Sequence, residues 1–150
     1  MTLLIRYWLD LCLLRAAPQD GPASTFVLGL ALTCYAMISV LVLTASYGML
    51  VGARLAVLDL LLLVTFILVL LYLSGKITRT YQTLAAMFGA GSLLGLCALP
   101  LVLLNNPSTE DTTLPAVASM AWLVLWFWHL VVSAHIIRHA LSSNLVVGFV

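Results

Sequence analysis

The chain has 150 residues, of which 64% are hydrophobic and 7% are charged, and its net charge is +1. Soluble domains carry about 25% charged residues, so this chain has too few charges to cover a globular surface in water. The small net charge also argues against nucleic acid as a partner. The composition predicts an integral membrane protein that faces membrane lipids over most of its area.

Residues 1–14 are too short to cross a membrane. Arg6 and Asp10 lie one helical turn apart and share a polar stripe, while Tyr7 and Trp8 suit the headgroup region. We predict an interfacial helix along the cytoplasmic leaflet, with a helix packed on protein under the bundle as the alternative. The two charges interrupt the apolar run, which is atypical of a secretory leader.

The segment "LLRAAPQDGPAST" (Leu13 to Thr25) follows this helix. Pro18 prevents a continuous helix, and Asp20 to Pro22 favour a turn. Ser24 or Thr25 can then cap the next helix. Residues 15–24 are therefore expected to form a stiff corner at the cytoplasmic face.

Four apolar stretches are each long enough to span about 30 Å of hydrocarbon. They cover residues 25–45, 55–73, 83–104 and 116–137. Because none alternates apolar and polar residues, helices are favoured over barrel strands. We predict an all-α integral membrane protein in a single domain of residues 1–150, with four transmembrane helices and the N-terminal interfacial helix. The ending "LSSNLVVGFV" (141–150) predicts the start of a fifth helix.

Basic residues set the expected orientation. Five of them fall on one side of the predicted spans (Arg6, Arg15, Lys76, Arg79 and Arg138), and Arg54 is the only one on the other side. The positive-inside rule places the five in the cytoplasm together with both ends of the chain. The loop Asn105 to Pro115 should face the opposite side. A bacterial inner membrane is the expected location.

Two ionisable residues fall inside or close to the second span. Asp59 is expected near its outer end, a little more than one turn from Arg54. Intramembrane charges are candidates for function, but one near the interface can reach water or pair with its neighbour. We therefore predict that Asp59 either extends toward the interface or forms an ion pair with Arg54, with an ion or proton role for Asp59 as the alternative.

The fourth span holds a histidine near its middle. His129 follows "WLVLWFW", and tryptophans at this depth usually face protein or a ligand pocket. A neutral His129 bonded to a neighbouring helix is the simpler interpretation. The alternative is a quinone or haem site made by His129 and Trp126, or a proton-relay role for His129. His135 and His139 have a spacing that can share a metal, but no acid or cysteine matches them, so we predict no metal site and no resident cofactor.

The third span carries small residues on one face. Gly91 and Gly95 lie four residues apart, and Gly89 and Ala85 extend the face. Such faces let helix backbones approach closely. We predict that these glycines pack against another helix, either within this chain or in a partner.

Two segments, "LLRAAPQD" (Leu13 to Asp20) and "WHLVVSAHIIRHAL" (Trp128 to Leu141), resemble bacterial membrane proteins of the Yip1 type. The resemblance implies a cytoplasmic N-terminal segment, a proline-marked entry to the first span and five closely packed helices. It also implies a scaffold role in membrane organisation, with trafficking partners.

These features predict a non-enzymatic accessory or structural subunit. It would pack against other integral membrane subunits in a hetero-oligomer or assist the assembly of the complex. One alternative is a small dimeric transporter or channel, although the small multidrug exporters use a glutamate in the first span and this first span has no acidic residue. The other is a redox or quinone-associated subunit that uses His129.

Overall fold

The computed structural model describes residues 2–105 and 113–141. Its helices are α1 (Thr2–Cys12), α2 (Thr25–Tyr47), α3 (Met49–Leu73), α4 (Thr80–Leu104) and α5 (Thr113–Leu141), with short 3₁₀ turns at Pro18–Asp20 and Ile77–Arg79. The described part of the chain contains no strand, and four of its helices are long and apolar enough to cross a membrane. The all-α fold with four candidate spans is thereby confirmed. The expected start of a fifth helix falls on residues 142–150, outside the described residues.

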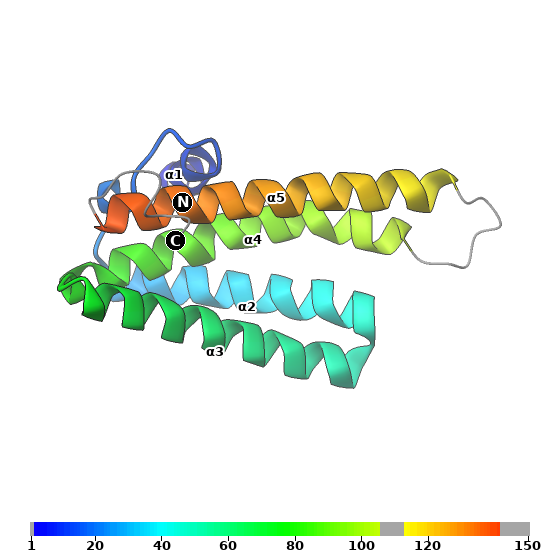
Figure 1. Cartoon of the computed structure of the whole chain (residues 1–150), viewed down its shortest axis with the longest axis horizontal. Helices are drawn as coiled ribbons and strands as arrows, with labels where there is room; N and C mark the ends of the chain where they lie inside the picture. The colour runs from blue at the N-terminus through cyan, green and yellow to red at the C-terminus, as the bar shows by residue number, and fades with distance from the viewer. Residues whose placement is uncertain (1, 106–112, 142–150) are drawn as a thin grey trace.

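The four long helices lie side by side in the order α5, α4, α2, α3 (Figure 1). The helix α4 contacts α2 on one side and α5 on the other, and α3 packs mainly on α2. Burial reflects this arrangement. Every residue of α4 from Thr83 to Ser92 is buried, whereas Ala31 is the only buried residue of α2. The protein is thus an open row of helices around α4, with most apolar side chains of α2 and α3 left on its surface.

A single residue, Gly48, joins α2 to α3. Its φ of 81° lies in the region that only glycine adopts at low cost, so the chain can reverse within one residue. The helix α3 therefore begins at Met49, earlier than the predicted start at residue 55. The charge of Arg54 does not prevent the helix from starting earlier. Its side chain is exposed, and a long basic side chain within a helix can extend its charged end toward the interface.

The other predicted spans fall inside longer helices. The stretches 25–45, 83–104 and 116–137 are contained in α2, α4 and α5, respectively. The helix α4 continues past Pro100 to Leu104. At the start of α2, Ser24 takes the cap position as expected, but its side chain makes no capping hydrogen bond.

The N-terminal helix α1 packs on protein. Trp8, Leu11 and Cys12 are buried against α4 and α5. The Trp128 indole of α5 donates to the Cys12 carbonyl over 3.0 Å. This hydrogen bond holds the C-terminal end of α1 against the middle of α5. The structure therefore matches the alternative of a helix packed under the bundle. Trp8 does not lie among headgroups, because the glycine at position 89 leaves room for its ring on α4.

The corner after α1 is fixed by hydrogen bonds to its neighbours. The Tyr7 hydroxyl donates to the Pro18 carbonyl over 3.1 Å, and Gln82 of α4 donates to the Gly21 carbonyl over 3.1 Å. Within the corner, the Asp20 carboxylate accepts the Ala17 N–H at 2.7 Å. Burial, followed by the nearby Asp20 charge, raises the pKa of Tyr7, so its hydroxyl stays protonated and remains a donor.

Two basic side chains close the C-terminal end of α5. The Lys76 ammonium donates to the Leu141 carbonyl, and the Arg79 guanidinium donates to the Ala140 carbonyl over 3.0 Å. These carbonyls have no partner inside the helix, and cations near a helix C-terminus also complement its dipole.

We expect Lys76→Met to lower the free energy of unfolding by about 1 kcal/mol, because a helix-end carbonyl loses a charged donor. Unfolding of the purified protein by SDS in mixed micelles measures this change. Arg54→Met is the matched control, since Arg54 is exposed at the other end of the row. Equal losses in the two variants would contradict the capping role.

We expect the Cys12 thiol to react slowly with iodoacetamide. It is buried, its sulfur lies 3.7 Å from the Ala90 carbonyl oxygen, and burial followed by the nearby Cys97 raises the pKa of Cys12 to about 11. At pH 8 only about one thiol in a thousand is then the reactive thiolate. Alkylation should therefore be at least about 100-fold slower than for a Gln19→Cys variant that lacks Cys12, since Gln19 is exposed. The rate should rise with pH up to about 11, and equal rates for the two thiols at pH 8 would contradict this placement of α1.

Candidate functional site

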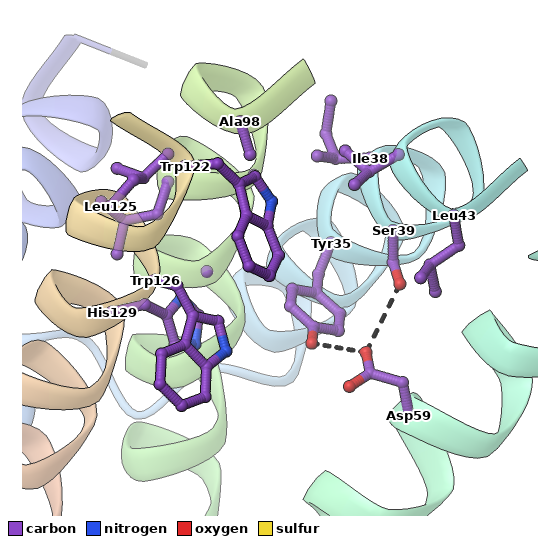
Figure 2. Close-up of a pocket in the computed structure, with 14 residues that line it drawn as sticks. Tyr35, Ile38, Ser39, Leu43, Asp59, Ala98, Trp122, Leu125, Trp126 and His129 are labelled. Atoms are coloured by element: carbon purple, nitrogen blue, oxygen red, sulfur yellow. Dashed lines mark hydrogen bonds between the residues drawn. The ribbon is translucent and has the colours of Figure 1, made fainter. Parts of the chain in front are cut away.

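A cavity of about 260 Å³ opens between α2, α3, α4 and α5. Its polar lining consists of Tyr35, Ser39, Asp59 and His129. Figure 2 shows Trp122, Trp126 and His129 of α5 on one side, facing Tyr35, Ser39 and Asp59 across the space. The open row of helices thus brings two of the sequence-predicted residues, Asp59 and His129, into one place.

Asp59 lies deeper than the sequence suggested. In α3 it is ten residues from Met49 and fourteen from Leu73, which is about 15 Å and 21 Å along the helix axis. Asp59 is therefore close to the middle of this helix and not near its outer end. The sequence suggested a span that begins after Arg54, whereas the helix begins before it.

The Asp59 carboxylate is held by two hydroxyl groups of α2. The Tyr35 hydroxyl donates to Oδ2 over 2.6 Å, and the Ser39 hydroxyl donates to the same oxygen over 3.4 Å (Figure 2). The two donors are four residues apart and so lie on one face of α2. The structure pairs Asp59 with these hydroxyls, where the sequence suggested Arg54.

The glycines of α4 make room for these side chains. A Cβ at Gly91 would lie 2.8 Å from the Tyr35 ring, and a Cβ at Gly95 would lie 2.7 Å from Ile38. Tyr35 also packs on Phe88 of α4, with ring centres 5.2 Å apart. Gly91 and Gly95 therefore pack against α2, and Gly89 packs against α1. All three glycines thus contact helices of this chain, which is one of the two alternatives that the sequence left open.

His129 is half-buried and lines the cavity opposite Asp59, together with Trp126. This is the pair that the sequence suggested for a cofactor. Sequence reasoning missed Tyr35 and Ser39, although their spacing in an otherwise apolar span was a usable signal.

His135 and His139 lie apart from this cavity, near the C-terminal end of α5. Their rings stand 4.5 Å apart, His135 Nε2 bonds to the Ala16 carbonyl at 3.0 Å, and Arg138 donates to His139 Nε2 over 3.1 Å. Each imidazole thus has a bond to another group. Within residues 2–105 and 113–141 no three histidine, cysteine or acidic side chains gather as a metal site would need.

A second cavity of about 350 Å³ lies at the C-terminal ends of α2 and α4. Tyr47 and Asn105 line it, and Trp122 borders both cavities. The two cavities are therefore neighbours that share the Trp122 side chain.

No protein-family model matches the chain, and no curated protein or solved structure matches it. The resemblance to Yip1-type proteins therefore stays a prediction.

Proposed function

We propose that this multi-pass membrane protein is a non-enzymatic accessory or structural subunit, which packs against other integral membrane proteins or assists their assembly. The observation that carries the proposal is the open row of helices, in which burial is concentrated in α4 and in the C-terminal part of α5, while α2 and α3 stay largely on the surface. Helices in lipid associate through close packing and hydrogen bonds, and a row one helix thick leaves large faces available for both.

The packing of α1 supports this proposal. Its buried side fixes it to α4 and α5, while its other side keeps Leu3, Ile5 and Leu9 exposed beside Arg6. A rigid apolar surface loses little conformational entropy when a partner binds it. With the five basic residues in the cytoplasm, this surface would lie in the cytoplasmic leaflet of a bacterial inner membrane.

A small dimeric transporter is the second candidate, and the depth of Asp59 favours it. A carboxylate at mid-span is unusual outside ion or substrate pathways. The carboxylate is in α3, whereas the small multidrug exporters carry theirs in the first span. A redox or quinone-associated subunit would use His129 and Trp126 of the same cavity.

Purification of the tagged protein from its own membranes in mild detergent tests these proposals. The accessory role predicts stoichiometric recovery of at least one other membrane protein, identified by mass spectrometry. Recovery of a homodimer alone would replace it with the transporter. An absorption spectrum of the same sample would reveal a haem or quinone and favour the redox alternative.

A further inference from the structure

We infer that the cavity between α2 and α5 binds a hydrophobic organic cation, with the Asp59 carboxylate as its counter-ion and the rings of Trp122 and Trp126 as its walls. This inference goes beyond the proposed subunit role and does not depend on it.

The carboxylate keeps one oxygen for a ligand. Tyr35 and Ser39 both bond to Oδ2, and no described residue donates to Oδ1. In the described residues, the only fully enclosed side-chain polar atom without a partner is Trp8 Nε1. Asp59 Oδ1, which also has no partner, is therefore not fully enclosed, and it is accessible from the cavity that Asp59 lines. The carboxylate is thus oriented by two donors and still has room for a positive charge beside it.

The walls favour a cation that carries little water. Trp122, Trp126 and Tyr35 line the cavity, and the faces of such rings attract cations, most strongly when the cation is desolvated. Ile38, Leu94 and Leu125 supply the apolar remainder. A quaternary ammonium group meets these conditions because it has no N–H groups that need acceptors.

The same lining disfavours metal ions. Sodium-like and calcium-like cations need about six oxygen ligands. The oxygen groups of the cavity are the Asp59 carboxylate and the hydroxyls of Tyr35 and Ser39, which already donate to it, and its other polar residue, His129, supplies nitrogen and no oxygen. A primary ammonium has a similar difficulty, since it needs three acceptors.

The size of the cavity limits the ligand. Its volume of about 260 Å³ lies just below the range of about 300–1,000 Å³ that is typical of small-molecule pockets, so the ligand must be small. A single aromatic ring with a trimethylammonium group suits this volume. Benzyltrimethylammonium is therefore the probe, and neopentylbenzene is its neutral carbon analogue of the same shape.

Equilibrium binding of both compounds to the purified full-length chain in lipid nanodiscs tests the inference, with empty nanodiscs subtracted. We expect saturable binding of benzyltrimethylammonium, at least about tenfold tighter than that of neopentylbenzene or benzylamine. Sodium chloride at equal concentration should not compete beyond its effect as a salt. Equal affinity for the charged compound and its neutral analogue would overturn the inference.

Variants locate the site. Asp59→Asn keeps an acceptor for Tyr35 and should weaken binding about tenfold or more, whereas Arg54→Gln removes a charge from the same helix outside the cavity and should leave it unchanged. Trp126→Leu should weaken binding about threefold to tenfold, and Phe127→Leu, on an exposed neighbour, should not. Trp126 is preferred to Trp122 because Trp122 also borders the second cavity. Unchanged binding in both cavity variants would overturn the inference even if one of them proved unstable.

Discussion

Gly52→Leu is expected to destabilise the protein by about 3 kcal/mol or more, because the new side chain has no space between α2 and α3. A Cβ at Gly52 would lie 2.5 Å from the Leu43 carbonyl group and from the Thr44 Cα. These are backbone atoms, so they cannot move aside without separating the two helices. Gly52→Ala should show a smaller loss in the same direction. SDS-induced unfolding in mixed micelles measures both changes.

Gly29→Ala is the matched control for Gly52→Ala. It lies in α2, and a Cβ there would meet no atom within 4 Å. Because alanine favours helix over glycine by about 1 kcal/mol, this variant should be as stable as the parent or slightly more stable. Equal behaviour of Gly29→Ala and Gly52→Ala would contradict the close approach of α2 to α3.

Gly89→Ala is expected to displace α1 and to cost about 2–3 kcal/mol. A Cβ at this position would lie 2.1 Å from Nε1 of Trp8 and 2.4 Å from its Cδ1. The Trp8 ring is buried, and its N–H has no acceptor among the described residues, so it has no better place to go. Displacement should expose Cys12, and its alkylation rate at pH 8 should rise at least about tenfold.

The double variant Trp8→Phe with Gly89→Ala tests whether the clash is with the indole. The nearest atoms belong to its five-membered ring, which phenylalanine lacks. Trp8→Phe should therefore recover most of the stability lost in Gly89→Ala, and by itself it should cost little because it removes an unpaired N–H. Additive losses in the double variant would show that α1 does not pack on Gly89.

The sequence was sufficient to predict the helices but not their arrangement. Apolar length alone identifies a span, so all four stretches appear as helices close to the expected bounds. Which helices touch depends on where small and large side chains meet. Gly91 and Gly95 indicated that α4 would be approached closely, but they did not indicate that Tyr35 and Ile38 of α2 would be the neighbours.

Only part of the candidate site could be predicted from the sequence, because the arrangement of the helices could not be. Asp59 and His129 were recognised because ionisable groups are rare in such spans. Their meeting in one cavity was not foreseen, since Asp59 was placed near the interface. Its depth depends on Gly48, which lets α3 begin directly after α2 and adds a turn and a half before Arg54.

Photo-cross-linking in living cells tests the subunit role most directly. A benzophenone amino acid replaces Phe66 of α3 or Phe127 of α5, which are 53% and 64% exposed, and buried Phe88 of α4 serves as the control. The account predicts that at least one exposed position forms a covalent product with a distinct membrane protein, whereas position 88 forms products only within the chain. Products with lipid or with a second copy of the same chain alone, at both exposed positions, would contradict it.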